Sequence, residues 1–344
     1  MAVYILNPLE DPRWAEFLHG HPRASVFHTS QWLDALQRTY GYLPLVFSTS
    51  EQSADLGNGL VFCRIDSRIT GSRLVSLPFS DHCEPLMDEG QAVNEVSDYL
   101  MCEAGKNKWK YIELRPLTSS WGSLAGFRPG EQFYFHSLDL RSPHLFQNLH
   151  KNSTQRKIHR AEREGLHYEE GRSNTLLQNF YHLLKMTRQR HGLPPQPLDW
   201  FRNLRDCLGN AIKFRVASKD GRPIASIVTL RHKDTVTYKY GCSDVRYHKL
   251  GGMHLLLWRT IEESAREGLR ILDLGRSDLD NTGLVTFKNR LGANCRSLTY
   301  LRSSFQAEAG KFHPWQFPVI RRLVSHLPDR VLNRAGKLLY RHVG

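Results

Sequence analysis

The segment of this sequence with the most chemical potential is Gly268–Ala293. A short apolar run, Leu269–Leu274, predicts a buried strand, and glycines and charged residues follow it. In α/β proteins, sites form where buried strands end in flexible turns. Lys288 carries a fixed positive charge there, which suits it to stabilise the oxyanion of a tetrahedral acyl-transfer intermediate. Asp273 or Asp278 is available to orient that lysine or to bind an ammonium group.

Two more segments place reactive side chains directly after predicted strands. In Tyr238–Asp244, the hydroxyl of Tyr240 is suited to donate to an oxyanion or to relay a proton, although outward-facing tyrosines on an alternating strand explain the pattern equally well. In Leu77–Leu86, Asp81 is a candidate for positioning an acceptor amine, with an ordinary turn acid as the alternative. The nearby Cys83 is a weak candidate nucleophile, because its histidine neighbour in sequence rarely becomes its catalytic partner.

Two predicted helix starts are candidates for binding anions. The segment Asn152–Gly165 predicts a helix with Arg156 and Arg160 on one stripe, and arginine in the first turn opposes the helix dipole. This pattern indicates a site for phosphate or diphosphate, and a solvated helix balanced by its own glutamates is the alternative. Gly251 and Gly252 open another predicted helix, where main-chain N–H groups can hold a phosphate, but two glycines alone are a weak signal.

The composition limits the class of protein. A length of 344 residues favours two domains, and 47 Lys and Arg against 34 Asp and Glu give a net charge of +13. That charge favours anionic partners, although a basic enzyme with no nucleic-acid role fits equally well. The six cysteines form no C-x-x-C pair, so neither a metal site nor a disulfide framework is predicted. Without a signal-peptide pattern or an apolar run of about 20 residues, we expect a cytoplasmic protein, and contact with the inner face of the membrane stays open.

The order of the predicted elements indicates an α/β (mixed α+β) chain with two domains of similar organisation, residues 1–145 and 146–310. One of the helices illustrates the signals used: Ser30 is its expected N-cap and Gly41 its stop. Strands are expected near residues 3–6, 43–48, 59–65, 73–77, 109–114, 212–218, 224–231, 235–241, 270–274 and 295–301, and helices near 11–19, 30–40, 91–104, 152–165, 175–190, 197–208 and 252–267.

The last segment, residues 311–344, differs from the rest. Apolar residues alternate with Arg and Lys from Ile320 to Arg341, with a break at Pro328, which predicts a basic amphipathic pair of helices. Such a tail can lie on an anionic bilayer. We favour the alternative that it docks on the protein's own core, because apolar stripes of this kind are usually core faces.

These motifs together resemble the FemAB-like branch of the GNAT acyltransferase superfamily, a group often labelled BioF2-like acetyltransferase domain or peptidoglycan interpeptide-bridge transferase. The likeness covers nearly the whole chain, and it is carried by Phe27–Trp32, Leu74–Leu86, the helix start RKIHRAEREG, YGCSD and, most specifically, GRSDLDNTGLVTFKNRLGA. The resemblance implies two tandem GNAT-like domains, each a mixed, mostly antiparallel sheet flanked by helices, with substrate in the cleft between them. It also implies acyl or aminoacyl transfer to an amine on a cell-wall or envelope glycan precursor.

The resemblance also implies roles for single residues. The lysine that follows phenylalanine in the late motif assists transfer in bridge-forming members, and Lys288 matches it. A tyrosine that ends the preceding hairpin matches Tyr240, and an acid after the first-domain strand matches Asp81. The arginine-rich helix start matches a region that contacts the acceptor's phosphates. The full set of expected site residues is Lys288, Tyr240 and Asp81 for catalysis, Arg156, Arg160, Phe287, Arg276, Asp278 and Trp32 for substrate binding, and Gly251 and Gly252 for the donor.

The sequence departs from the family pattern where the donor would bind. The helical arm that grips transfer RNA in bridge-forming enzymes is absent or very short, and RYHKLGGMH does not keep the acyl-CoA pattern of ordinary GNAT enzymes. We therefore expect no tightly bound cofactor, and the donor is either acyl-CoA or aminoacyl-tRNA. The first hypothesis is N-acyl or aminoacyl transfer to an anionic small-molecule or lipid-linked glycan precursor. The alternatives are an aminoacyl-tRNA-dependent interpeptide-bridge transferase and a non-catalytic envelope-glycan binding or membrane-associated assembly protein. DNA is not an expected partner.

Overall fold

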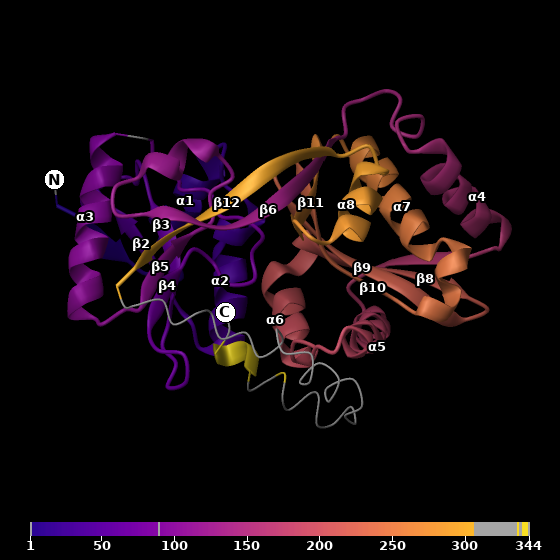
Figure 1. Cartoon of the computed structure of the whole chain (residues 1–344), viewed down its shortest axis with the longest axis horizontal. Helices are drawn as coiled ribbons and strands as arrows, with labels where there is room; N and C mark the ends of the chain where they lie inside the picture. Colours follow the sequence, from indigo (N-terminus) through magenta and orange to yellow (C-terminus); the bar gives the residue numbers. More distant parts are fainter. Residues whose placement is uncertain (1, 89, 306–335, 337–338, 343–344) are drawn as a thin grey trace. The chain divides into compact units, whose positions relative to one another are not determined.

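The computed structural model describes residues 2–88, 90–305, 336 and 339–342 (Figure 1). The chain divides into two compact units. Unit 1 comprises residues 1–133, 298–313 and 337–344, and unit 2 comprises residues 134–297 and 314–336. The predicted amphipathic tail, residues 311–344, lies almost wholly outside the described residues. No helix among the described residues has the length and apolar character that crossing a membrane requires.

Unit 1 contains helices on a sheet whose strands mostly alternate in direction. Its elements are β1 (Tyr4–Leu6), α1 (Pro12–Gly20), η1 (Val26–His28), α2 (Ser30–Tyr40), β2 (Leu43–Ser48), β3 (Leu60–Ile65), β4 (Arg73–Val75), α3 (Gln91–Lys106), β5 (Tyr111–Leu114), η2 (Ser119–Ser123) and the first part of β6 (Arg128–Asp139). Strands β1 to β4 pair antiparallel in chain order, and β4 then pairs parallel with β5. The neighbour of β5 on its other side is β12 (Asn294–Ser304), which pairs with it antiparallel.

The core of unit 1 forms where α3 packs on this sheet. Val93, Val96, Leu100 and Ala104 recur at helical spacing and are buried against strand residues such as Phe62. Helix α2 shows how local signals set the ends of an element. Gly41 closes α2 in the left-handed conformation, as predicted, but the N-cap is Thr29, whose hydroxyl accepts from Trp32 N–H at 3.3 Å. The expected cap, Ser30, instead donates its hydroxyl to the carbonyl of Pro8.

The described end of the chain is bound to unit 1. The Tyr42 hydroxyl donates to the carbonyl of Tyr340 at 2.7 Å. The carbonyl of His342 accepts from Thr70 and from the buried Arg73, and the His342 ring contacts the Ser67 hydroxyl at 2.8 Å. These contacts fix residues 340–342 on the same unit as the N-terminus of the chain.

Unit 2 repeats the arrangement. Its elements are the second part of β6, the π-helical turn η3 (Lys151–Gln155), α4 (Arg156–Arg163), β7 (His167–Gly171), α5 (Asn174–Arg190), α6 (Leu198–Leu208), η4 (Gly209–Ala211), β8 (Ile212–Lys219), β9 (Arg222–His232), β10 (Thr235–Ser243), η5 (Val245–Leu250), α7 (Gly252–Arg266), β11 (Ile271–Asp278), α8 (Thr282–Asn289) and the start of β12. Strands β7 to β10 pair antiparallel in order, and β10 pairs parallel with β11.

Helices cover both faces of the unit 2 sheet (Figure 1). On one face, Ile158 of α4 and Leu256, Leu257 and Ile261 of α7 pack against strand residues such as Leu272. On the other face, Phe180 of α5 and Phe201 of α6 pack against the rings of Phe214 and Tyr240.

The strands of each unit therefore follow the same plan, four antiparallel strands and then a parallel one, and this confirms the predicted mixed, mostly antiparallel fold class. In the sheet order, β12 lies beside β5, and β6 lies beside β11. Each unit thus completes its sheet with a strand from the other half of the chain. Among the strands and α-helices of the described residues, β6, β7 and α8 were not predicted from the sequence.

Candidate functional site

The late charged segment forms regular structure rather than a flexible turn. Strand β11 continues through Arg276 to Asp278, and α8 begins at Thr282. The side chain of Asn281 caps α8 by accepting from the N–H of Leu284 at 3.1 Å. The expectation of loose turns between residues 275 and 293 is therefore wrong, because a strand extension and a capped helix order most of this segment.

Strands β10 and β11 pair only at their beginnings. Three residue pairs, from Thr235 with Ile271 to Thr237 with Asp273, join them, although β10 continues to Ser243 and β11 to Asp278. Beyond these pairs, the main-chain groups of β11 that would face β10 need other partners. The side chain of Asp273 supplies one, since it accepts from the N–H of Gly275 at 2.7 Å.

Lys288 supplies the complementary donor. Its side chain is only 2% exposed, and Nζ donates to the carbonyls of Gly275 at 3.1 Å and Arg276 at 2.8 Å. Burying an ammonium group is costly unless hydrogen bonds compensate it, and these two carbonyls do so. The protein thus holds a buried positive charge where β11 has separated from β10.

His136 lies close to this charge, and sequence reasoning missed it. The ring is fully buried on β6. Burial, and secondly the charge of Lys288, lower the pKa of His136 to about 4. The imidazole is therefore neutral at pH 7. In the sequence, Phe133 and Phe135 are two positions apart, and so are His136 and Leu138. This spacing was the available signal for the strand.

Tyr240 and Lys288 belong to opposite faces of the unit 2 sheet. Tyr240 packs against the rings of Phe180 and Phe201, and its hydroxyl accepts from Trp200 Nε1–H at 2.8 Å. A β-bulge causes this placement, because the register of β10 against β9 shifts between Tyr238 and Tyr240. Tyr238, two residues earlier, packs with the α7 core. The structure therefore does not bring the Tyr240 ring to the face on which Lys288 lies.

A hollow of about 420 Å³ opens beside α8, on the side of the helix away from Lys288. Its wall includes two cationic side chains, Lys157 and Arg290, and the ring of Phe287. The Phe287 ring stands edge-on to that of His254, with centroids 5.2 Å apart. Burial, and then the charge of Lys157, lower the pKa of His254 to about 4. The remaining wall residues are hydroxyl-bearing or glycine: Ser153, Thr154, Thr282, Gly283 and Thr286.

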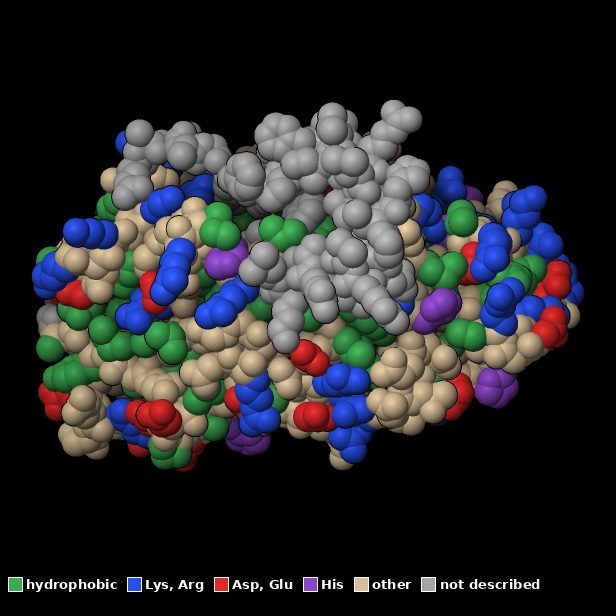
Figure 2. Space-filling view, turned by 90° about the horizontal axis from the view of Figure 1, so that it is seen from below, with side chains coloured by type: hydrophobic (Ala, Val, Ile, Leu, Met, Phe, Trp, Pro, Cys, Tyr) green, Lys and Arg blue, Asp and Glu red, His purple; other side chains and the backbone are tan. Residues whose placement is uncertain are grey.

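The wall composition suits an anionic ligand. Ammonium, guanidinium and hydroxyl groups are the usual partners of phosphate oxygens, and an aromatic edge suits a flat or apolar portion of a ligand. The predicted anion-binding arginines lie next to this hollow in sequence. Arg156 and Arg160 are exposed on α4, and Arg160 pairs with Glu164 at 3.5 Å. Elsewhere, Lys and Arg side chains are interspersed with acidic ones over the face shown in Figure 2.

Gly251 and Gly252 are required for packing. Gly251 adopts φ +82°, and a Cβ there would come within 2.3 Å of the carbonyl oxygen of Lys157. A Cβ added at Gly252 would lie 3.0 Å from the Cβ of Ala225. The start of α4 thus covers the turn that was expected to hold the donor's phosphates. This gives both glycines a role that does not depend on a ligand.

Unit 1 contributes Asp81, which is half-buried in the loop after β4. Its carbonyl accepts from the Tyr300 hydroxyl at 2.8 Å. The nearby Cys83 is buried, its sulfur lies 3.4 Å from His28 Nε2, and burial strongly raises the pKa of the thiol. A thiol of this kind is a poor nucleophile at pH 7. Trp32 is fully buried against Phe27 and forms part of the core.

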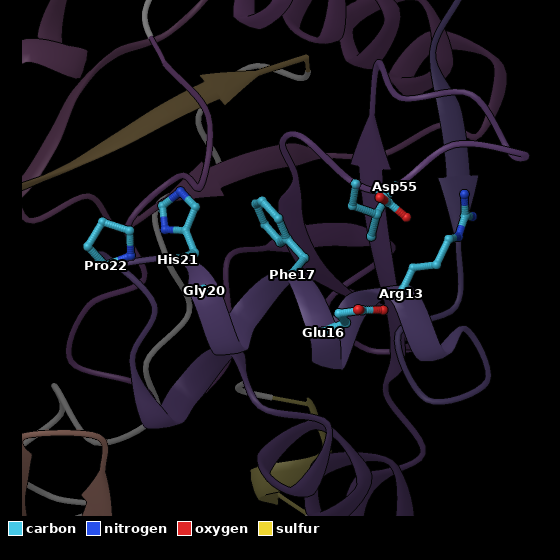
Figure 3. Close-up of a pocket in the computed structure, with 8 residues that line it drawn as sticks. Arg13, Glu16, Phe17, Gly20, His21, Pro22 and Asp55 are labelled. Carbon is cyan, nitrogen blue, oxygen red and sulfur yellow. The ribbon is translucent and has the colours of Figure 1, made fainter.

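A second hollow, of about 350 Å³, lies on unit 1 beside α1 (Figure 3). It is lined by Arg13, Phe17, His21 and Asp55 among others, and none of the predicted site residues is there. Arg13 already donates to Asp11 and to the carbonyls of Glu51, Gln52 and Ala54.

Comparisons with known proteins agree with this architecture. Residues 149–289, most of unit 2, match the family model described as acetyltransferase (GNAT) domain. The solved structure of FemX superposes with a TM-score of 0.70 at 13% identity, covering 89% of this chain and 98% of that one. A tandem GNAT protein from the clavulanic acid biosynthesis pathway superposes with a TM-score of 0.57 at 11% identity, covering 89% and 100%. The fold is therefore that of a tandem GNAT protein.

A sequence match to one known enzyme indicates the kind of transferase that this chain resembles. Over 97 residues, 28% of this chain, the sequence is 25% identical to a UDP-N-acetylmuramoylpentapeptide-lysine N(6)-alanyltransferase from Weissella viridescens. The match spans 29% of the length of that relative. These matches agree with the resemblance to FemAB-like GNAT proteins that the late motif predicts. The predicted acyltransferase class is supported by the domain match and by this relative.

Proposed function

We propose that the protein transfers an acyl or aminoacyl group to an amino group of a cell-envelope glycan or lipid-linked precursor. The observation that carries this proposal is the buried Lys288, held by two β11 carbonyls where β10 and β11 separate. A buried cation at this point is suited to developing negative charge, because the low local dielectric strengthens its attraction. The GNAT domain match over the same segment gives independent support.

The chemistry is direct aminolysis. The acceptor amine attacks the carbonyl carbon of the donor's ester or thioester and forms a tetrahedral oxyanion, which Lys288 stabilises. Collapse of this intermediate forms the amide bond and expels the donor's hydroxyl or thiol, which takes up the proton that the amine loses. We assign acceptor binding to Asp81, whose carboxylate suits an ammonium group. We assign Tyr240 no direct part in this proton transfer, because its ring packs among Phe180 and Phe201 in the α5–α6 aromatic cluster.

The donor binds through phosphate groups, and we place these in the hollow walled by Lys157 and Arg290. The carbonyl of Lys157 packs against Gly251, so a diphosphate held on the Gly251–Gly252 turn in the manner of acyl-CoA is disfavoured. Aminoacyl-tRNA is therefore the donor we favour, and acyl-CoA is the alternative. Transfer of an aminoacyl group also agrees with the alanyltransferase name of the Weissella relative.

The test begins with donor and acceptor binding. Purified protein is titrated with acetyl-CoA, alanyl-tRNA and UDP-N-acetylmuramoyl pentapeptide, and the melting temperature is recorded for each. A ligand that binds only the folded state raises it by linkage. The pairs that bind are then incubated together, and mass spectrometry detects the acylated acceptor.

The decisive variant is Lys288→Met, which keeps the aliphatic stem and removes the charge. Loss of an oxyanion donor lowers kcat by about 10²–10³, and we expect a fall of that size. The matched control is Lys106→Met, because Lys106 is exposed and its ammonium group pairs with Glu103 at 2.8 Å. Full activity of Lys288→Met would remove Lys288 from the mechanism. Acceptor binding without transfer from either donor would favour the glycan-binding alternative.

A further inference from the structure

The loop that carries Asp81 has an unusual backbone. Leu77 and Phe79 both adopt φ +61°, the left-handed region, although neither is glycine. This conformation is unfavourable for residues with a Cβ, and it persists only where the surrounding structure imposes it. Such strained segments concentrate at functional sites.

Arg115 is the main restraint. Its guanidinium donates to the carbonyls of Leu77 at 2.9 Å and Ser80 at 3.1 Å, and a third bond joins it to Glu113 at 3.0 Å. The arginine side chain is 12% exposed and that of Glu113 4% exposed, so the arrangement is buried. One planar fork thus fixes both ends of the strained segment.

Tyr300 of β12 restrains the other side of the loop. Its hydroxyl donates to the carbonyl of Asp81 at 2.8 Å, and the Arg115 guanidinium lies over its ring, 5.0 Å from the centroid. The backbone is held again two residues later, where Cys83 N–H donates to the carbonyl of Arg115 at 2.7 Å. Asp81 is therefore flanked by fixed points on both sides.

The Phe79 side chain explains why the loop cannot relax. Its ring packs against Tyr40, with centroids 5.0 Å apart, and against Tyr340, with centroids 5.9 Å apart. A return of Phe79 to an ordinary backbone conformation would withdraw the ring from these partners.

From these contacts we propose that Arg115 and Tyr300 are positioning residues, which hold the Leu77–Asp81 loop so that the carboxylate of Asp81 is set for the acceptor amine. This inference rests on the proposed function, in which Asp81 binds that amine. Neither positioning residue touches substrate, and both act through the backbone of Asp81.

The sharpest variant is Tyr300→Phe, which removes one hydroxyl and keeps the ring beneath Arg115. The matched control is Tyr181→Phe, because the Tyr181 hydroxyl also donates to a main-chain carbonyl, that of Gln196 at 3.2 Å, within unit 2. Both variants lose the same kind of bond, so we expect similar small decreases in melting temperature. Only Tyr300→Phe is expected to raise the KM for UDP-N-acetylmuramoyl pentapeptide, by about three- to tenfold, with the donor KM unchanged.

A double variant separates positioning from stability. The double variant combines Tyr300→Phe with Asp81→Asn. If Tyr300 acts through Asp81, its acceptor KM is less than about twofold higher than that of Asp81→Asn alone. Equal acceptor KM values for Tyr300→Phe and Tyr181→Phe, or full additivity with Asp81→Asn, would overturn the positioning role while the transferase stands. If the wild-type protein neither binds nor acylates this acceptor, the proposed function fails, and the positioning role fails with it.

Discussion

The turn before α7 gives a prediction that separates packing from ligand binding. Replacing Gly251 with Ala adds a Cβ that would lie 2.3 Å from the carbonyl oxygen of Lys157 and 3.0 Å from its carbonyl carbon. Neither atom belongs to a flexible side chain, so α4 and the turn must move apart. Gly251 also has φ +82°, which disfavours any side chain.

The expected magnitude has two parts. A left-handed backbone costs a non-glycine residue about 1–2 kcal/mol. Forcing extra volume into a packed contact costs about 1–3 kcal/mol more. The sum, about 2–5 kcal/mol, corresponds to a fall in melting temperature of roughly 4–20 °C for a unit of this size.

Gly165→Ala is the matched control. Gly165 has φ +64°, and nothing lies within 4 Å of a Cβ built there, so this variant carries only the backbone cost. Urea unfolding of the two variants and of the wild-type protein, followed by tryptophan fluorescence, gives the difference between them. We expect Gly251→Ala to be less stable than Gly165→Ala by about 1–3 kcal/mol.

Two results would refute this reasoning. Equal stability of the two alanine variants would show that the Lys157 carbonyl does not restrict Gly251. A Gly251→Ala protein with the stability of Gly165→Ala but without donor binding would instead show that the turn holds the donor's phosphates, as first expected from the sequence. Donor binding is measured by calorimetry in the same samples.

Three further predictions follow from the same unit. Replacing Lys157 and Arg290 together with Gln should weaken binding of the phosphate-bearing donor about tenfold or more and reduce its salt dependence in calorimetric titrations. Because the pKa of His136 is lowered from 6.5 to about 4, the unfolded chain binds the proton more readily, so stability is complete above about pH 6.5 and falls as the pH drops towards 4. His136→Asn should flatten this part of the pH–stability curve in urea unfolding, and an unchanged slope would contradict the assignment. Trp200→Phe removes the N–H that binds Tyr240 and should lower the unfolding free energy by about 1–3 kcal/mol, and a change below 0.5 kcal/mol would contradict the bond.

Most helices and strands could be predicted because their signals are local. Helix α2 has a capping residue, an apolar stripe and a left-handed glycine within a dozen residues, and its predicted range, residues 30–40, is the observed one. Strands β1 to β4 and β8 to β10 are rich in Val, Ile, Leu and Phe and were placed within a few residues. The family motif then gave the tandem fold class.

The sequence could not predict which strand completes each sheet. Strand β6 begins with residues such as Arg128 and Gly130 and is exposed over its first five residues, so it lacks the apolar signal of the other strands. The pairing of β5 with β12 joins residues nearly 190 positions apart, and no local pattern encodes such a partner. Helix α8 was missed because its eight residues include a glycine and β-branched side chains, which favour other structures.

The sequence predicted which residues belong to the site, but it did not predict how they are arranged. Lys288 was correctly singled out, but its burial and its two carbonyl partners depend on how far β11 extends beyond its pairing with β10. Phe287 was predicted to contact substrate and does line the hollow beside α8. Whether these residues act as proposed is a prediction that the variants above test.

The bulge in β10 allows two tyrosines that are only two positions apart to occupy opposite faces of the sheet. Lys239 is the extra residue, because Tyr238 lies opposite Thr229 and Tyr240 lies opposite Val228. Deletion of Lys239 would leave both pairs intact, so the side chains from Tyr240 to Ser243 would keep their faces. The strand can therefore gain or lose one residue at this point without moving the Tyr240 ring out of the α5–α6 aromatic cluster.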